Sequence, residues 1–133
     1  ECYTGLKNAV LPGESGKCVV LLECMSNLAA NEMFSREQPV DRETVIAKIL
    51  QGIEVLGKQA DPLVIVTNNV FEDGIAYDSA TIEYIEALGR VNERLAAEAD
   101  EVVEVVAGVP QRIKAYPISI ERKQACVLSN LFS

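Results

Sequence analysis

An acidic residue that ends a short apolar run is the clearest candidate for chemistry in this sequence. The run is Cys18–Leu22, five apolar residues without alternation, and Glu23 follows it directly. Such a run predicts a strand that is buried on both faces, as in a parallel sheet covered by helices. A carboxylate at the C-terminal end of this strand lies where open α/β sheets bind ligands and where nucleotide-binding proteins hold Mg²⁺. The alternative is a solvated acid that simply ends a strand at the surface.

A second set of polar residues follows the next apolar run. Residues 63–67 read Leu-Val-Ile-Val-Thr and predict another buried strand, which ends in Asn68 and Asn69. Because parallel strands present their C-terminal ends at one edge of a sheet, we expect Glu23 and Asn68 to share that edge. Residues 13–17, Gly-Glu-Ser-Gly-Lys, are only partly like a phosphate-binding loop, because they lead into a strand and not into a helix. We interpret them as a connection.

Three amphipathic helices are predicted to position these strands. The first begins near Ser26, which is available as its N-cap, and carries an apolar stripe. The second covers residues 42–58 with Asp41 as N-cap, and the third covers residues 78–98. Gly89 lies inside the third helix, where glycine costs about 1 kcal/mol relative to alanine, so we expect it to mark close packing. The stripe of the first helix consists of Met25, Leu28, Ala29 and Met33.

Two further strands complete the predicted sheet. Residues 101–107 form a valine-rich strand, and residues 111–114 form a short edge strand, where the preceding Pro110 does no harm. The order strand, helix, helix, strand, helix, strand indicates an α/β fold with a mostly parallel sheet. We assign residues 1–114 to the C-terminal part of a single α/β domain that is a candidate for nucleotide binding, and residues 115–133 to a tail for which the sequence predicts no role.

Composition excludes several classes of function. The 133 residues contain no histidine, which excludes histidine-based catalysis and histidine metal ligands within this sequence. The net charge of −8 argues against nucleic acid or an anionic membrane as a partner. The four cysteines lack zinc-site spacing and fit a reduced protein, and no apolar run approaches the roughly 20 residues of a membrane helix. We therefore expect a cytoplasmic protein without a membrane span.

Four segments, in order, resemble one family, the bifunctional adenosylcobinamide kinases and adenosylcobinamide-phosphate guanylyltransferases of cobalamin biosynthesis. The first is an acidic strand end followed by a small polar residue, and the second is a strand that ends in asparagine. The third is a helix with a Leu-Gly-x-x-Asn-x-x-Leu-Ala pattern, and the fourth is a Gly-x-Pro-x-x-x-Lys ending. In this chain they are Glu23-Cys24-Met25-Ser26 with Asn31, residues 66–70, residues 88–102, and Gly108 to Pro110 with Lys114.

The resemblance implies a P-loop NTPase-like, RecA-like fold, a mostly parallel sheet flanked by helices, with the N-terminal part missing here. It implies an enzyme that phosphorylates adenosylcobinamide with ATP or GTP and then transfers GMP from GTP to the product. The family's phosphate loop and GMP-carrying histidine are not in this sequence, so we assign no catalytic residue and expect the chain itself to be inactive. Glu1, Glu23 and Asn68 are implied nucleotide-binding residues, and Glu23 is also the implied Mg²⁺ ligand.

At several positions the sequence departs from the family pattern, which leaves the roles of these residues open. Glu23 stands in place of the usual Asp, Asn69 in place of a common Glu, and Phe71 where Gly is frequent. Asn92 is equally compatible with a functional role and with a structural hydrogen bond.

The family is associated with trimers, so we expect a homo-oligomer. Two alternative functions stay open: a non-catalytic α/β subunit that binds a nucleotide or a partner, and a flavodoxin- or receiver-like module, for which Glu23 is the only acidic residue at the end of the first strand.

The resemblance also makes a prediction about the sheet. In the family, the strand that precedes the phosphate loop lies in the sheet interior, and the sequence does not contain that segment. The remaining strands are therefore expected to leave a gap or an unpaired apolar edge. Such an edge recruits other chains, so we expect the protein to be poorly stable and prone to association.

Overall fold

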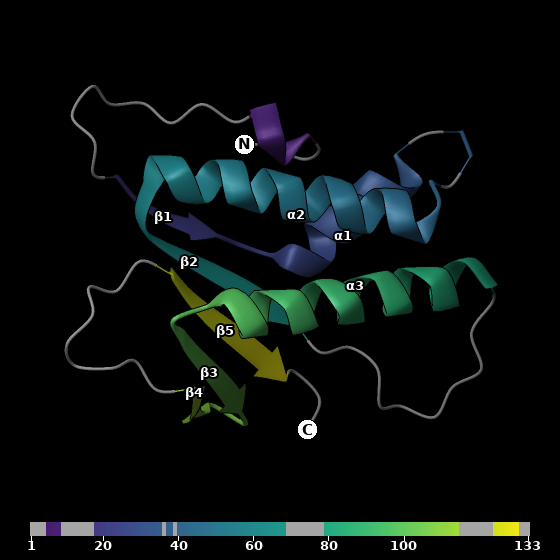
Figure 1. The fold of residues 1–133 in the computed structure, drawn as a ribbon. Helices are drawn as coiled ribbons and strands as arrows, with labels where there is room; N and C mark the ends of the chain where they lie inside the picture. The colour runs from purple at the N-terminus through teal and green to yellow at the C-terminus, as the bar shows by residue number, and fades with distance from the viewer. Residues whose placement is uncertain are drawn as a thin grey trace.

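A computed structural model describes residues 5–8, 18–35, 37–38, 40–68, 79–114 and 124–130. Within these residues the chain forms a five-stranded sheet with three helices on one side (Figure 1). The elements are η1 (Leu6–Asn8), β1 (Cys18–Leu22), α1 (Met25–Phe34), α2 (Arg42–Gln59), β2 (Ala60–Asn68), α3 (Ser79–Glu98), β3 (Glu101–Val106), β4 (Val109–Lys114) and β5 (Gln124–Asn130). The predicted α/β class is confirmed.

The sheet is mostly parallel, with the strand order β1-β2-β5-β3-β4. β1 pairs with β2, β2 with β5, and β5 with β3, each in parallel, whereas β4 pairs with β3 in antiparallel orientation. β4 is thus the edge strand that the sequence predicts. Parallel pairing brings the C-terminal ends of β1, β2, β5 and β3 to a single edge of the sheet.

One face of the sheet is packed against the helices. On β2, Leu63, Ile65 and Thr67 alternate with less buried neighbours and have no exposed surface. They meet apolar residues of the helices in a continuous core, as the strand and helix periods require. The buried apolar residues of the core include Met25, Leu28, Met33, Val45, Ile49, Ile53, Leu56, Leu88, Val91 and Leu95.

The other face of the sheet is open, which corrects the prediction that β1 is buried on both faces. Val20 and Leu22 of β1 pack against the core, but Val19 is 71% exposed and Leu21 is 61% exposed. The reason is that α1, α2 and α3 all lie on the opposite side of the sheet, and no helix in the described part of the chain covers this face.

The first helix starts earlier than predicted. α1 begins at Met25, and its N-cap residue is Cys24, whose side chain makes no capping hydrogen bond. Ser26 is therefore the second residue of the helix and is buried, so its prediction as N-cap is wrong. A buried serine needs hydrogen-bond partners, and Ser26 finds them across the sheet edge instead of at the helix end. The predicted apolar stripe is confirmed, because all four of its residues are buried.

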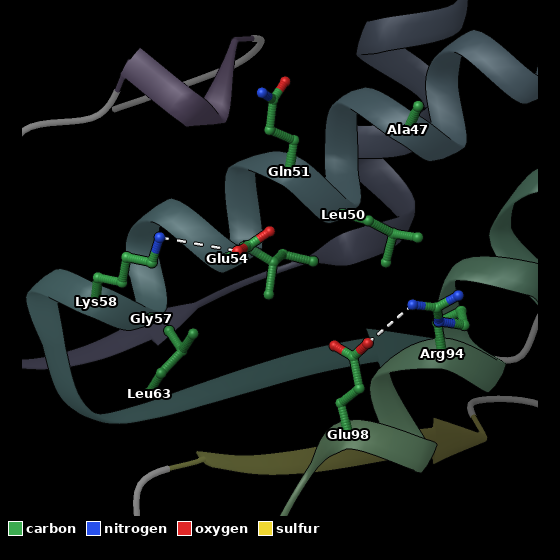
Figure 2. A pocket seen from close by; sticks show the side chains of 10 residues that line it. Ala47, Leu50, Gln51, Glu54, Gly57, Lys58, Leu63, Arg94 and Glu98 are labelled. Atoms are coloured by element: carbon green, nitrogen blue, oxygen red, sulfur yellow. Dashed lines mark hydrogen bonds and ion pairs between the residues drawn. The ribbon is translucent and has the colours of Figure 1, made fainter.

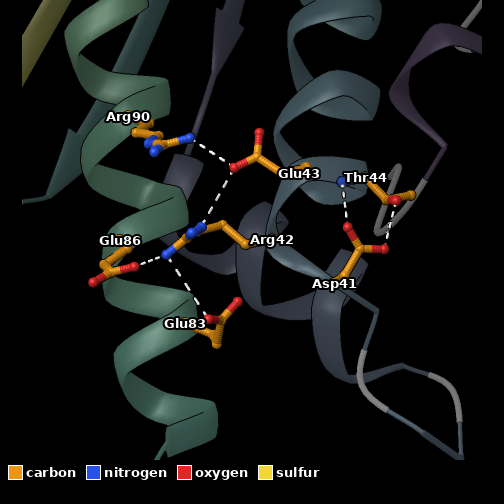
Figure 3. A network of polar contacts seen from close by, with 7 residues as sticks. All are labelled: Asp41, Arg42, Glu43, Thr44, Glu83, Glu86 and Arg90. Carbon is orange, nitrogen blue, oxygen red and sulfur yellow. Dashed lines mark hydrogen bonds and ion pairs between the residues drawn. The ribbon is translucent and has the colours of Figure 1, made fainter.

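The second helix is capped and clamped by polar contacts (Figure 3). Asp41 is the predicted N-cap and accepts hydrogen bonds from the backbone N–H of Thr44 at 3.1 Å and from its hydroxyl at 2.6 Å. Arg42 forms ion pairs with Glu83, at 3.8 Å, and with Glu86 on α3. A further pair joins the two helices, between Arg90 and Glu43 at 2.7 Å. These contacts, of which the Arg90–Glu43 pair is exposed and those of Arg42 are partly buried, fix the start of α2 against α3.

The N-terminal turn η1 is held against α2 and α1. The side chain of Leu6 is buried, and Gly52 of α2 lies so close that an added Cβ would come within 2.7 Å of the Leu6 Cβ. The backbone N–H of Gly5 donates to the carboxylate of the buried Glu32 at 2.5 Å. The Lys48 ammonium lies 4.0 Å from the other oxygen of Glu32. Gly52 and the buried Glu32 therefore form the two contacts that hold η1 in place.

The third helix departs from one expectation and explains one motif. Gly89 is exposed, and an added Cβ would meet nothing within 4 Å, so the prediction that it marks close packing is wrong. The ammonium of Lys114 donates to the carbonyls of Ala97 at 3.0 Å and Ala96 at 3.4 Å, near the C-terminus of α3. These carbonyls belong to the last turn of a helix, where a cation is favoured.

The hairpin between β3 and β4 is a two-residue turn. Val106 pairs with Val109, and the residues between them, Ala107 and Gly108, have φ angles of 49° and 80°. Two consecutive positive φ angles are typical of the type I′ turn, whose twist matches that of the flanking strands. The glycine of the Gly-x-Pro motif is therefore explained by the turn, and Pro110 is exposed in the edge strand.

The interior of the sheet contains no gap between β2 and β3, so one of the two outcomes expected from the resemblance is wrong, whereas the other, an unpaired edge with apolar side chains, is found at β1, which pairs only with β2 among the described strands and carries the exposed Val19 and Leu21. β5, from the segment treated as a tail, lies between β2 and β3, pairing with β2 from Leu63↔Gln124 to Asn68↔Ser129. It pairs with β3 from Glu101↔Ala125 to Val106↔Asn130. The physical reason is that Ala125 to Leu128 supply an apolar strand that satisfies the hydrogen-bonding groups of both neighbours.

Candidate functional site

The structure places Glu23 and Asn68 at the same edge of the sheet. Glu23 directly follows β1 and is exposed, while Asn68 is the last residue of β2. β1 and β2 are adjacent and parallel, with Leu22 opposite Ile65. The edge shared by these residues is therefore as predicted, although β1 is the outermost strand of the described sheet rather than a central one.

Ser26 connects this edge to three elements. Its hydroxyl lies 2.7 Å from the Cys24 sulfur and accepts a hydrogen bond of 3.4 Å from the Asn68 amide. Its backbone carbonyl accepts a hydrogen bond of 3.1 Å from the Tyr84 hydroxyl of α3. The residue is only 7% exposed, so the contacts satisfy polar groups that would otherwise be buried alone. The sequence analysis missed this role of Ser26, because it joins residues that are 42 and 58 positions apart.

Tyr84 closes the cluster from the helix side. Burial raises the pKa of the Tyr84 hydroxyl above its usual value, and the nearby Cys24 contributes in the same direction. Both effects disfavour the charged phenolate, so Tyr84 stays a neutral hydrogen-bond donor. Its ring lies 6.2 Å from that of Phe34, at an angle of 52°. The side chain is therefore fixed at both its polar and its apolar end.

Asn92 has a structural contact in this arrangement. The hydroxyl of Thr67 has no exposed surface and donates to the Asn92 side-chain oxygen at 2.6 Å. A buried hydroxyl without a partner would destabilise the fold, so this bond explains the asparagine of the helix motif. The same hydrogen bond joins the end of β2 to α3, one residue before Asn68.

The donors at this edge fit a metal that is shared with a nucleotide. In the described part of the chain there is no group of three or more Cys, Asp or Glu side chains arranged to hold a metal ion. Mg²⁺ is commonly held by one or two carboxylates together with water and substrate phosphates. An exposed Glu23 carboxylate at the edge where β2 also ends is compatible with that mode, and not with a site built from protein ligands alone.

Three other positions singled out from the sequence cannot be placed at this edge. Glu1, Asn69 and Phe71 are outside the described residues. One strand end at this edge was not predicted. The end of β5 lies beside the end of β2, with Ser129 opposite Asn68. A signal for it exists in the sequence: the apolar run Ala-Cys-Val-Leu at 125–128 is followed by Ser-Asn, much as Cys18–Leu22 is followed by an acid.

A groove of about 820 Å³ lies away from this edge, between the C-terminal halves of α2 and α3 (Figure 2). Leu50, Ile53 and Leu63 contribute apolar walls. Each charged pair at its rim belongs to a single helix, with Lys58 3.8 Å from Glu54 and Arg94 3.0 Å from Glu98. Leu63 lies near the start of β2, so the groove is at the opposite end of the strand from Asn68. Its cations already have acidic neighbours, which makes it a poor phosphate site.

The fold and the polar edge define a class, an α/β protein with a mostly parallel sheet whose candidate ligand site lies at the C-terminal ends of the strands. Residues 1–113 match the family model described as cobinamide kinase / cobinamide phosphate guanyltransferase. The chain belongs to this family. No helix in the described part of the chain is long and apolar enough to cross a membrane.

Two curated relatives agree with this assignment. The chain is 31% identical over 123 residues to the bifunctional adenosylcobalamin biosynthesis protein CobU of Salmonella typhimurium, covering 86% of the chain and 68% of the relative. It is 30% identical over 105 residues to the protein of the same name from Escherichia coli, covering 72% of the chain and 58% of the relative. The chain thus spans about three fifths to two thirds of the length of these relatives. β5 lies beyond the residues that the family model matches.

Proposed function

We propose that this chain is part of an enzyme that phosphorylates adenosylcobinamide with ATP or GTP and transfers GMP from GTP to adenosylcobinamide phosphate. The observation that carries the proposal is the family match over residues 1–113, which includes both strand ends that meet at the candidate site. The relatives' names link them to adenosylcobalamin biosynthesis. We further propose that the protein acts in the cytoplasm as a homo-oligomer, the trimer that the resemblance implies.

The residues at the sheet edge have distinct proposed roles. Glu23 would hold Mg²⁺ or a water molecule bound to it, and the metal would offset negative charge on the nucleotide phosphates. Asn68 would donate or accept hydrogen bonds at the same nucleotide, with its amide oriented by Ser26. Glu1 would accept hydrogen bonds from the guanine nucleotide. Phosphoryl transfer depends mainly on such positioning and charge stabilisation.

The 133 residues contain no histidine and no Gly-rich loop that ends in Gly-Lys-Ser. We propose that they bind nucleotide but do not complete either reaction alone. The first test incubates the purified chain with adenosylcobinamide, GTP and Mg²⁺, and in a second reaction with adenosylcobinamide phosphate, and measures the release of GDP and of pyrophosphate. No release above the enzyme-free control is expected, and clear turnover would contradict this proposal.

The second test measures the affinity for Mg²⁺–GTP by calorimetry. Glu23→Ala should weaken binding by about tenfold or more, equivalent to about 1.4 kcal/mol, because a charged ligand of the metal is lost. Asn92→Ala is the comparison, since its side chain already bonds to Thr67, and it should weaken binding much less. Equal losses in the two variants, with both folded by circular dichroism, would mean that the metal site is misassigned.

A further inference from the structure

Tyr84 joins α3 to the start of α1 by a hydrogen bond between the two helices. The Tyr84 hydroxyl donates to the backbone carbonyl of Ser26 at 3.1 Å, and Ser26 is the second residue of α1. In an α-helix, the carbonyl of such a residue accepts a hydrogen bond from the backbone N–H four residues later. The Ser26 carbonyl is therefore an acceptor inside α1 already, and the bond from Tyr84 serves to hold the first turn of α1 against α3.

Ser26 extends this contact to the ends of both strands at the candidate site. Its hydroxyl lies 2.7 Å from the sulfur of Cys24, the residue that directly follows Glu23. The same hydroxyl accepts a hydrogen bond of 3.4 Å from the side-chain amide of Asn68, the last residue of β2. Because Ser26 is only 7% exposed, its hydroxyl depends on these protein partners and not on water.

The sheet itself does not fix the side chain of Asn68 relative to Glu23. The pairing between β1 and β2 ends with Leu22 opposite Ile65, and Asn68 lies three residues further along β2. Backbone pairing with β5 reaches Asn68 but leaves the rotation of its side-chain amide undetermined. An asparagine amide has two nearly equivalent rotations, which exchange its donor and acceptor ends. The hydrogen bond to Ser26 therefore decides which end of the amide faces a ligand.

We propose that Tyr84 is a positioning residue of the nucleotide site, and that it fixes the Asn68 amide relative to Glu23 by holding Ser26 in place. The inference rests on the function proposed above, in which Glu23 and Asn68 bind Mg²⁺–GTP. Tyr84 acts on the residues of the site and not on the nucleotide. With the amide nitrogen of Asn68 donating to Ser26, the amide oxygen is the end that accepts a hydrogen bond from the nucleotide or from water bound to Mg²⁺.

The surroundings of Tyr84 suit a rigid hydrogen-bond donor. Burial raises the pKa of its hydroxyl, so the group stays protonated and keeps the proton that it donates to Ser26. Its ring packs on that of Phe34, with the ring centres 6.2 Å apart. Tyr84→Phe keeps this ring contact and removes only the hydroxyl, so it isolates the hydrogen bond to Ser26.

A double-mutant cycle on the intact chain tests the proposal, with the dissociation constant for Mg²⁺–GTP measured by calorimetry. Tyr84→Phe should weaken binding by about three- to tenfold, while the melting temperature stays close to that of the wild type. Ser26→Ala should weaken binding at least as much. The two changes together should weaken it no more than Ser26→Ala alone, because the tyrosine acts through the serine. If Ser26→Ala fails to fold, Asn68→Ala replaces it in the cycle with the same expectation.

A spectroscopic measurement separates positioning from a merely structural role. In ¹H–¹⁵N spectra of the nucleotide-free chain, the side-chain amide signals of Asn68 should shift in Tyr84→Phe. Arg90→Lys is the matched control, because it changes another polar contact between α3 and a second helix, the 2.7 Å pair with Glu43, and keeps the charge. It should leave both the Asn68 signals and the affinity unchanged.

The possible failures can be told apart. A wild-type chain that shows no saturable binding of Mg²⁺–GTP would overturn the proposed function, and this inference with it. Wild-type binding that Tyr84→Phe retains in full, or loses only together with its folded structure, would overturn the role of Tyr84 alone. Additive losses in the cycle, or unchanged Asn68 signals in Tyr84→Phe, would show that Tyr84 does not act through Ser26 and would also overturn the inference.

Discussion

The two faces of the sheet are built by the same strands but have opposite surroundings. On β1, Val20 and Leu22 pack against the helices, while Val19 and Leu21 are largely exposed. The difference follows from the connections. The chain passes from β1 to β2 through α1 and α2, and from β2 to β3 through α3, moving across the sheet in the same direction both times. Crossovers of one hand in one direction place their helices on one face.

This comparison shows what an apolar run predicts and what it does not. A run such as Cys18–Leu22 predicts a strand, but whether both faces are covered depends on where the other segments lie. Substitutions can separate the covered face of the sheet from the open one, and close packing on the helices from open packing.

The largest contrast is between truncations on the two faces of the sheet. Ile65 has no exposed surface, so Ile65→Ala should lower the free energy of unfolding by about 2–5 kcal/mol. Leu21→Ala on the open face should cost less than about 0.5 kcal/mol at low micromolar protein. Urea unfolding measures both. A similar cost at both positions in dilute solution would show that the open face is covered within the chain.

A second contrast compares two glycines of α2. Gly52→Ala should destabilise the protein by about 1–3 kcal/mol, because the new methyl group would clash with Leu6. Gly57→Ala is the matched control in the same helix, where nothing lies within 4 Å, and it should be neutral or stabilising by up to about 1 kcal/mol. Hydrogen exchange at residues 5–8 should accelerate only in Gly52→Ala. Unchanged exchange there would contradict the docking of η1 at Gly52.

A third contrast concerns glycines that differ in backbone conformation. Gly89→Ala should raise the free energy of unfolding by about 1 kcal/mol, since the position is helical and has open space around it. Gly108→Ala should lower it by about 1 kcal/mol, because its φ of 80° is unfavourable for alanine. Thermal melts distinguish the two signs. A destabilising Gly89→Ala would restore the close-packing interpretation of this glycine.

The smallest effect is the pH dependence contributed by the α2 cap. Hydrogen bonds from the Thr44 hydroxyl and backbone N–H lower the pKa of Asp41 below its ordinary value. The carboxylate therefore contributes stability above the unfolded pKa, near 3.8, and this contribution is lost as the pH falls through the lower folded value. The melting temperatures of the wild type and Asp41→Ala should differ at pH 6 and converge near pH 3. A constant difference would mean that the cap does not depend on charge.

Much of the fold was predictable because local signals agreed with the tertiary structure. The Asp41 cap, the helical stripe from Met25 to Met33 and the edge strand after Pro110 are each specified by neighbouring residues. The position of β5 was not predictable in this way. Its apolar residues are visible in the sequence, but its insertion between β2 and β3 depends on pairing across more than fifty residues.

At the candidate site, too, local features were predictable and long-range contacts were not. The residue types at the ends of β1 and β2 pointed to one edge, and parallel pairing places Glu23 and Asn68 there. The Ser26 contacts depend on distant segments, because Tyr84 comes from another helix and Asn68 from another strand. Gly89 was misinterpreted because it was judged from its residue type, although its position directly after Leu88 lies off the buried stripe of Leu88, Val91 and Leu95.

The central claim is that the edge formed by the ends of β1 and β2 is the nucleotide site. Titration of the ¹⁵N-labelled chain with Mg²⁺–GTP, followed by backbone amide chemical shifts, tests it most directly. The largest changes should fall on Glu23, Cys24 and Asn68, while Leu50 and Glu98 at the groove between α2 and α3 remain unaffected. Shifts concentrated at that groove, or no saturable shifts at millimolar nucleotide, would contradict the claim.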